Sequence, residues 1–142
     1  MSLENNKAVI RRLIEEAYNE SNLDVVDEVM APDVFDHAAV PEHQHGIEAF
    51  KHVIQWVRAI SSDVYFDIDD IIAEGDKVAV RMTASGTHTG PLRGIPPTGK
   101  SFSVDYVHWF RIADGKVAEL WAVRDDLGRL QQLGLIPVLG ES

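Results

Sequence analysis

The stretch that decides the fold runs from Ser85 to Gly134. It reads SGTHTGPLRGIPPTGK over residues 85–100, SVDYVHWFRIADGKVAELW over 103–121 and DDLGRLQQLG over 125–134. A loop rich in glycine and proline is followed by an aromatic strand that carries one histidine, His108. A titratable group on a half-buried aromatic strand is typical of a small-molecule site.

Period-two alternation of apolar and polar residues continues on both sides of this strand. It predicts strands over residues 64–73, 77–87, 102–112 and 116–124. Asp114-Gly115 has the chemistry of a tight hairpin turn between the last two strands, and Glu74-Gly75-Asp76 that of a turn between the first two. These strands therefore form an antiparallel meander.

Helical spacing of apolar residues dominates the first half of the chain. It predicts helices over residues 4–19, 24–30 and 46–60, and a last short helix follows the strands at 125–133. Pro32-Asp33 interrupts the pattern after the second helix. Helices first and strands afterwards indicate an α+β fold, with the helices on one face of the sheet.

Composition narrows the functional class. The 142 residues fit one domain over 1–142, and the absence of cysteine removes thiol nucleophiles, disulfides and thiolate metal sites. The net charge is −10, from 23 acidic and 13 basic residues without a basic cluster, so no nucleic-acid partner is expected. Without a signal-peptide pattern or a bilayer-length apolar run, we expect a cytoplasmic protein with no membrane partner.

The parity of the strand over 102–112 separates two faces. One face carries Phe102, Val104, Tyr106, His108, Phe110 and Ile112. The opposite face carries Val107 and Trp109, which is unusual for an antiparallel sheet with one wet side. We assign the His108 face to the helices. We assign the Val107–Trp109 face to a homodimer interface, because an isologous dimer buries the same patch twice.

The element order and four segments resemble the SnoaL-like polyketide cyclase family of the nuclear-transport-factor-2-like superfamily. The segments are GTHTG at 86–90, GIPPTGK at 94–100, VHWFRIADGKVAELW at 107–121 and LGRLQQLG at 127–134. The resemblance implies a cone-shaped, cystatin-like α+β barrel, in which a curved antiparallel sheet wraps around the N-terminal helices and encloses an apolar pocket. It also implies a dimer through the sheet.

The resemblance further implies ring closure by an intramolecular aldol reaction, without metal or cofactor. The catalytic histidine of the family matches His108. The same ungapped match places the catalytic aspartate of the family at Ala122, which cannot move a proton. This departure leaves the second proton-transfer group open.

Other side chains are candidates for that role or for the pocket wall. His37, Arg124 and Asp125 are candidates for proton transfer or for a donor to a developing oxyanion. The candidate ligand-binding residues are Tyr18, Phe35, Trp56, His88, Tyr106, Phe110 and Ala122. The segment 94–99 is interpreted as a shaped loop at the pocket rim, and the histidines of 42–45 lack a third metal ligand at usable spacing.

Three functional hypotheses follow from this pattern. The first is a cofactor-independent cyclase or isomerase that acts on a polyketide-like carbonyl compound, with His108 as general base or acid. The second is a non-catalytic protein of the same fold that binds an apolar small molecule. The third is a dimeric interaction domain whose cavity is only packed core. Separately, His108 has the alternative interpretation of a buried histidine bonded to one partner.

Overall fold

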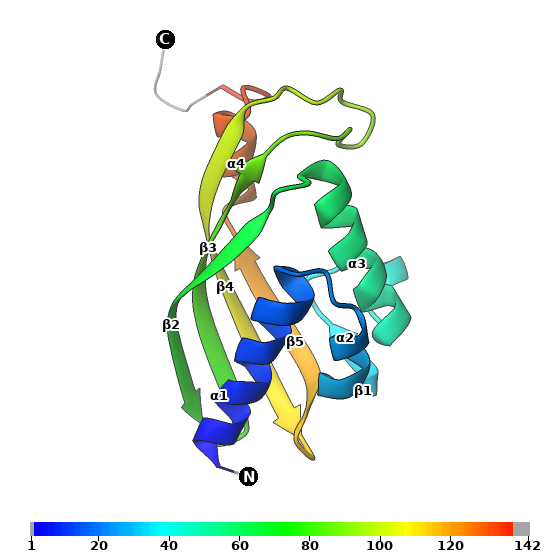
Figure 1. The fold of residues 1–142 in the computed structure, drawn as a ribbon, viewed down its shortest axis with the longest axis vertical. Coiled ribbons are helices and arrows are strands. Elements are labelled where there is room, and N and C mark those ends of the chain that lie inside the picture. The colour runs from blue at the N-terminus through cyan, green and yellow to red at the C-terminus, as the bar shows by residue number, and fades with distance from the viewer. Residues whose placement is uncertain (1, 138–142) are drawn as a thin grey trace.

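A curved five-stranded sheet with helices packed on its concave face forms the described part of the chain, residues 2–137 of the computed structural model (Figure 1). The strands are β1 (Met30–Asp36), β2 (Tyr65–Glu74), β3 (Lys77–Thr87), β4 (Ser101–Ala113) and β5 (Lys116–Arg124), in the spatial order β1-β5-β4-β3-β2. The helices are α1 (Leu3–Arg12), α2 (Asp24–Val29), α3 (Ile47–Ile60) and α4 (Asp126–Gln132). Short helical turns η1 (Leu13–Tyr18) and η2 (Pro41–His43) complete the order.

The four predicted strands are confirmed, each with ends within one residue of the prediction. Consecutive strands from β2 to β5 pair antiparallel, as a meander requires. At the β4–β5 turn, Asp114 and Gly115 have φ values of 52° and 76°. Positive φ at both central residues suits the right-handed twist of a tight hairpin. The sequence pattern of this turn therefore predicted its conformation correctly.

The fifth strand, β1, was not predicted. Residues 30–36 pair in parallel with β5, so the sheet is antiparallel except at this edge. The expected interruption at Pro32-Asp33 falls inside the strand. Proline is tolerated there because β1 is an edge strand, and an edge strand does not need every backbone N–H for the ladder.

The first helix also differs from its prediction. Regular α-helix ends at Arg12, and Leu13–Tyr18 forms a π-helical turn instead of continuing the α-helix through residue 19. The wider turn is visible in the backbone hydrogen bond from Asn19 N to the Ile14 oxygen, at 3.0 Å. A π-turn adds one residue to a helical turn and often occurs at functional sites.

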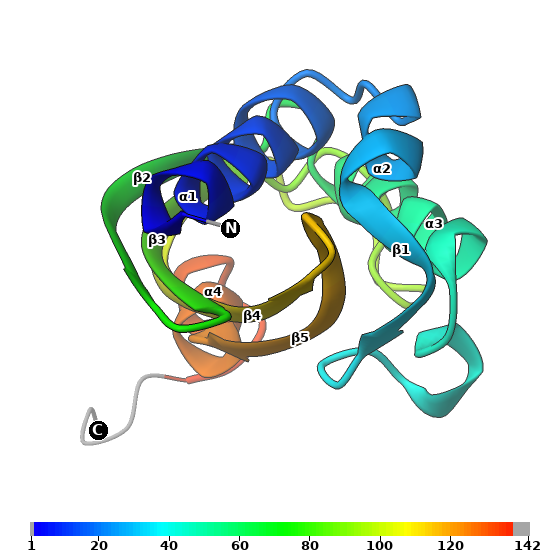
Figure 2. The same ribbon diagram turned by 90° about the horizontal axis from the view of Figure 1, so that it is seen from below.

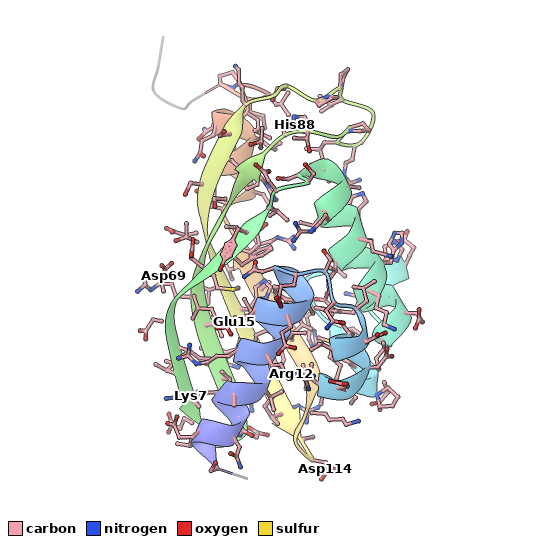
Figure 3. All side chains as sticks on the ribbon, viewed as in Figure 1. Lys7, Arg12, Glu15, Asp69, His88 and Asp114 are labelled. Carbon is pink, nitrogen blue, oxygen red and sulfur yellow. The ribbon has the colours of Figure 1, made fainter. Side chains whose placement is uncertain are left out.

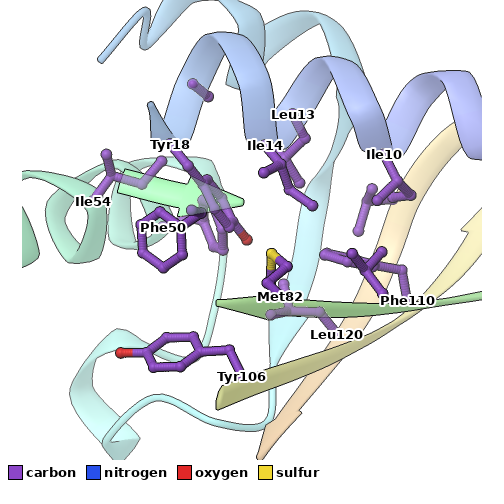
Figure 4. Packing of buried hydrophobic residues seen from close by; sticks show 14 of the residues in the cluster. Ile10, Leu13, Ile14, Tyr18, Phe50, Ile54, Met82, Tyr106, Phe110 and Leu120 are labelled. Atoms are coloured by element: carbon purple, nitrogen blue, oxygen red, sulfur yellow. The ribbon is translucent and has the colours of Figure 1, made fainter. Parts of the chain in front are cut away.

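Strand parity predicted the two faces of β4 correctly. The six residues of the helix-facing side are all buried, whereas Val107 and Trp109 are 39% and 45% exposed. Figure 4 shows the core between the helices and the sheet, with Ile10, Leu13 and Ile14 facing Met82 and Phe110.

Viewed along the strands, the sheet curls around the helices like part of a cone (Figure 2). It does not close, because β1 and β2 remain its two edges. Within the described residues, no helix combines the length and apolarity needed to cross a membrane.

Candidate functional site

A cavity lies between the helices and the concave face of the sheet. The space open to the centres of water-sized molecules is about 70 Å³, and most of the wall is apolar. The lining residues are Tyr18, Asp36, Ala38, Phe50, Val53, Ile54, Val57, Val64, Phe66, Tyr106, His108, Leu120, Ala122 and Arg124. An apolar cavity with a few convergent polar groups is the usual form of a small-molecule site.

His108 and Tyr18 meet at this cavity from opposite layers. The Tyr18 hydroxyl lies 3.2 Å from His108 Nδ1, and both side chains are buried. Burial, with a smaller contribution from the positive charge of Arg124, lowers the pKa of His108 from 6.5 to about 3. Burial and the nearby Asp36 raise the pKa of Tyr18 well above 10. Both groups are therefore neutral at physiological pH.

Asp36 is the buried carboxyl group of the cavity. It is 6% exposed, and its Oδ1 accepts a hydrogen bond of 2.9 Å from the backbone N–H of Ala38. Burial raises the pKa of Asp36, while that backbone contact, the charge of Arg124 and weaker contacts oppose the rise. A carboxylate made more basic by an apolar environment is suited to accept a proton from a substrate.

Arg124 and Tyr106 form a polar end of the cavity. They are cross-strand partners in the β4–β5 ladder, and Arg124 Nε lies 3.5 Å from Asp126 Oδ2. The Tyr106 hydroxyl accepts a 3.0 Å hydrogen bond from Arg129. Burial raises the pKa of Tyr106, so its phenol also stays protonated.

Five of the predicted site residues line the same cavity. They are Tyr18, Tyr106, His108, Ala122 and Arg124. His108 lies directly opposite Ala122, and Tyr106 opposite Arg124, so β4 and β5 supply four of the five. Tyr18 comes from the end of η1, and Figure 4 shows its ring projecting from the helix toward the sheet, beside Phe50.

The structure places His37 and Phe35 outside the cavity lining. His37 Nε2 lies 2.7 Å from Glu119 Oε2, and its ring stacks on Trp121 with the centroids 4.6 Å apart. Phe35 packs against the rings of His37 and His45. Phe35 has the opposite parity to Asp36 on β1, which directs its side chain away from the cavity, and His37 lies in the turn that follows the strand.

Four other predicted residues, Trp56, Phe110, Asp125 and His88, also lie outside the cavity lining. Trp56 is 43% exposed on α3, where the guanidinium of Arg93 lies 5.9 Å from its ring. Phe110 is fully buried in the core. Asp125 caps α4, because its Oδ1 accepts a hydrogen bond from the N–H of Gly128 at 2.8 Å.

His88 is fully buried, but it lies at one end of the sheet beside the loop 88–100, far from Asp114 at the other end (Figure 3). Its Nδ1 accepts a hydrogen bond from the Thr98 N–H at 3.1 Å. Residues 94–99 do not belong to the cavity lining, which differs from their interpretation as a pocket rim. The loop instead packs on the end of α3, where the N–H groups of Thr89 and Gly90 donate to the Ile60 oxygen.

Asp36 is the polar residue of the cavity lining that was not among the predicted site residues. Val34, two residues earlier, is also buried, so residues 34 and 36 share one face of β1. That parity would have found it only if residues 30–36 had been interpreted as a strand. Among residues 2–137, no three His, Cys, Asp or Glu side chains lie close enough together to hold a metal ion.

The sequence of this chain is similar to those of known proteins. A nogalonic acid methyl ester cyclase of Streptomyces nogalater is 37% identical over 120 residues, which cover 83% of this chain and 90% of that protein. The aklanonic acid methyl ester cyclase DnrD of Streptomyces peucetius is 33% identical, over 89% of this chain and 88% of its own.

Solved structures with a similar fold and sequence are also known. TsrD from Streptomyces laurentii superimposes with a TM-score of 0.85 at 33% identity, covering 96% of this chain and 99% of its own. IdmH from Streptomyces antibioticus, a putative polyketide cyclase, gives a TM-score of 0.80 at 34% identity, covering 91% and 98%.

The family model for SnoaL-like polyketide cyclases matches residues 8–133, which include the second half of α1, all the later helices, the whole sheet and every residue of the cavity. This chain therefore belongs to the SnoaL-like polyketide cyclase family.

Proposed function

We propose that this protein is a cofactor-independent cyclase that closes a ring of a polyketide-like carbonyl compound by an intramolecular aldol reaction, with Asp36 as the base. The observation that carries the proposal is a buried carboxyl group with a raised pKa in an apolar cavity that also holds neutral and cationic donors. Two of the relatives are a nogalonic acid methyl ester cyclase and an aklanonic acid methyl ester cyclase. A hydrogen on a carbon between two carbonyl groups is acidic enough for such a base.

The reaction needs no group beyond those of the cavity. The Asp36 carboxylate removes a proton from the carbon between two carbonyl groups, and the electron pair passes to the enolate oxygen. The enolate carbon then attacks a ketone carbon of the same molecule, which forms a C–C bond and converts that carbonyl oxygen to an alkoxide. The proton held by Asp36 is transferred to the alkoxide, so the product is an isomer of the substrate.

His108 and Arg124 serve this reaction as donors. With a pKa of about 3, the imidazole is too weak a base to accept the proton efficiently, but its ring can donate a hydrogen bond while neutral. The Arg124 guanidinium carries a positive charge and several N–H donors in a fixed planar geometry. Donors aimed at the oxygen that becomes negative stabilise the transition state more than the substrate.

Asp36 supplies the carboxyl group that the alanine at position 122 lacks. In the β1–β5 pairing, Asp36 lies beside Leu120, two residues before Ala122 on the same strand. Both Asp36 and Ala122 line the cavity. A carboxyl group from β1 thus reaches the cavity that a carboxyl group at position 122 would have entered from β5.

The test compares Asp36→Asn with the wild type on two probes, nogalonic acid methyl ester and aklanonic acid methyl ester. The asparagine keeps an oxygen for the Ala38 N–H but cannot act as a base, so we expect kcat to fall by roughly 10²- to 10⁴-fold. Asp33→Asn, on the exposed side of the same strand, is the matched control and should retain full activity. Asp36→Asn with wild-type turnover would contradict the assignment.

A non-catalytic binding protein is the alternative, and Ala122 is the observation that favours it. The same apolar cavity would then hold a probe without changing it. Either ester would then quench the tryptophan fluorescence of the wild-type protein, and chromatography with mass detection and NMR would find no cyclised product. That result would support binding and exclude turnover of these probes.

We also propose that the chain forms a homodimer through the outer face of the sheet. Two apolar cross-strand pairs, Val107–Val123 and Trp109–Trp121, lie side by side on this face. Val123 is 74% exposed, which is costly for an isolated chain. On β4, Asp105 and Arg111 lie three residues on either side of position 108, so an antiparallel twofold contact would bring Asp105 of one protomer to Arg111 of its partner.

A further inference from the structure

The position of Tyr18 is set by an irregular helix end. It is the last residue of the π-helical turn η1, and Ile14 and Asn19 close that turn through an i to i+5 hydrogen bond. The extra residue in the turn rotates the following side chains relative to a regular α-helix. Tyr18 is thereby directed at the sheet and is 6% exposed.

The backbone on either side of Tyr18 is held by two other elements. Arg58 of α3 donates to the Tyr18 oxygen at 2.7 Å and to the Asn19 oxygen at 3.3 Å. The Asn19 side chain both donates to and accepts from the backbone of Phe66 on β2, at 2.9 and 2.8 Å. The backbone oxygens of Tyr18 and Asn19 lie at a helix end and have no partner within the helix. Arg58 therefore satisfies acceptors that would otherwise lack a hydrogen bond.

Only one arrangement of protons satisfies the Tyr18–His108 contact. Among the described residues, the sole hydrogen-bond partner of the Tyr18 hydroxyl is His108 Nδ1, and the His108 ring makes no other hydrogen bond. If Nδ1 carried the proton, the phenol O–H would be buried with no acceptor, which is unfavourable. If the phenol donates, Nδ1 is the acceptor and the ring proton resides on Nε2.

We propose that Tyr18 is a positioning residue: its hydroxyl donates to His108 Nδ1 and thereby fixes the imidazole as the Nε2–H tautomer, whose N–H is the hydrogen-bond donor presented to a ligand carbonyl in the cavity. The inference deepens the proposed function and rests on it for the role of that donor. The tautomer itself is a property of the free protein and does not depend on turnover.

The surroundings of the ring keep it neutral, as the proposal requires. The titratable and charged groups that share the cavity with His108 are Tyr18, Asp36, Tyr106 and Arg124. Burial and the Arg124 charge disfavour the imidazolium, and Tyr18 and Tyr106 remain protonated phenols. The Phe110 and Tyr106 rings pack at 5.8 and 5.9 Å from the imidazole and restrict its rotation.

The first experiment is the long-range ¹H–¹⁵N NMR spectrum of the His108 ring in the ligand-free wild type between pH 5 and 8. We expect a protonated-type shift for Nε2 and an unprotonated-type shift for Nδ1 across this range. A ring with the proton on Nδ1, a fast mixture of both tautomers, or an imidazolium at pH 7 would overturn the proposal without any variant.

The second experiment uses Tyr18→Phe, with Tyr106→Phe as the matched control. Both variants remove the phenol oxygen of a buried tyrosine whose ring packs near the His108 ring, but the Tyr106 hydroxyl bonds to Arg129 instead of to the imidazole. We expect Tyr18→Phe alone to shift the two ring nitrogens toward a tautomer mixture. A Tyr18→Phe spectrum identical to that of the wild type would contradict the positioning role.

Turnover separates this inference from the proposed function. On the same two methyl ester probes, Tyr18→Phe should lower kcat by about 5- to 10-fold with little change in KM, because one hydrogen bond that orients the donor is lost. A shifted tautomer with wild-type kcat would show that Tyr18 positions a ring that the reaction does not use, which contradicts the role of the donor and leaves the Asp36 assignment intact.

Discussion

His108 and Ala122 lie directly opposite each other in the β4–β5 ladder, and both face the cavity. The pair explains why the site has a neutral histidine. Ala122 places no carboxylate opposite the ring, and burial together with the positive charge of Arg124 lowers the pKa of His108 to about 3.

Ala122→Asp should reverse this balance. Cβ atoms of directly opposed residues lie roughly 4.5–5.5 Å apart, so the new carboxylate would favour the imidazolium and raise the pKa of His108. The ¹⁵N chemical shifts of the ring, followed from pH 3 to 8, measure the change. Ala118→Asp, on the same strand but outside the cavity lining, is the control. An unchanged titration in Ala122→Asp would show that residue 122 does not act on the ring.

The stability of the protein should depend on pH through His108. Its pKa is about 3 in the folded protein and 6.5 in the unfolded chain, so between these values only the unfolded chain binds the proton. The free energy of unfolding should therefore fall as the pH drops from 6.5 toward 3, by at most about 1.4 kcal/mol per pH unit from this group. Asp36 acts with the opposite sign, because burial raises its pKa.

Urea unfolding at pH 4, 5, 6 and 7 checks this dependence. The difference between the wild type and His108→Gln isolates the histidine, and the variant should lose less stability on acidification. His52→Gln, which removes an exposed ring, is the control. Parallel curves for the wild type and His108→Gln would contradict a neutral buried imidazole.

The proposed dimer predicts different outcomes for two tryptophans of similar exposure. Trp109→Glu should yield monomers in sedimentation equilibrium or light scattering, because the substitution places a charge at the centre of the outer apolar face. Trp56→Glu should leave the mass unchanged, since Trp56 is 43% exposed on α3 rather than on the sheet. A monomeric wild type, or a Trp109→Glu variant that remains dimeric, would exclude this interface.

Gly90 should be required for the loop 88–100 to pack on α3. A Cβ added at this position would overlap the backbone oxygen of Ala59. Gly90→Ala should therefore lower the free energy of unfolding by about 1–3 kcal/mol, the usual cost of overpacking. Thermal unfolding beside Pro91→Ala, a change at an exposed neighbour, measures the effect. Equal stability of Gly90→Ala and the wild type would show that the loop can shift without cost.

Local patterns in the chain were sufficient for most of the sheet. Alternation along β2 to β5 and the Asp114-Gly115 turn depend on neighbours a few residues apart, so they could be predicted without knowing the rest of the fold. The same alternation assigned His108 to the buried face and Trp109 to the exposed face.

The cavity itself depends on contacts between distant parts of the chain. β1 is a strand because β5, some 80 residues later, supplies a parallel partner, and only that pairing brings Asp36 to the site. Tyr18 and His108 are 90 residues apart, and their contact depends on a π-helical turn that apolar spacing does not reveal. Periodicity encodes which face of an element is apolar. The protonation state of a buried group depends instead on the distances to neighbours that folding brings together, and those distances exist only in the assembled structure.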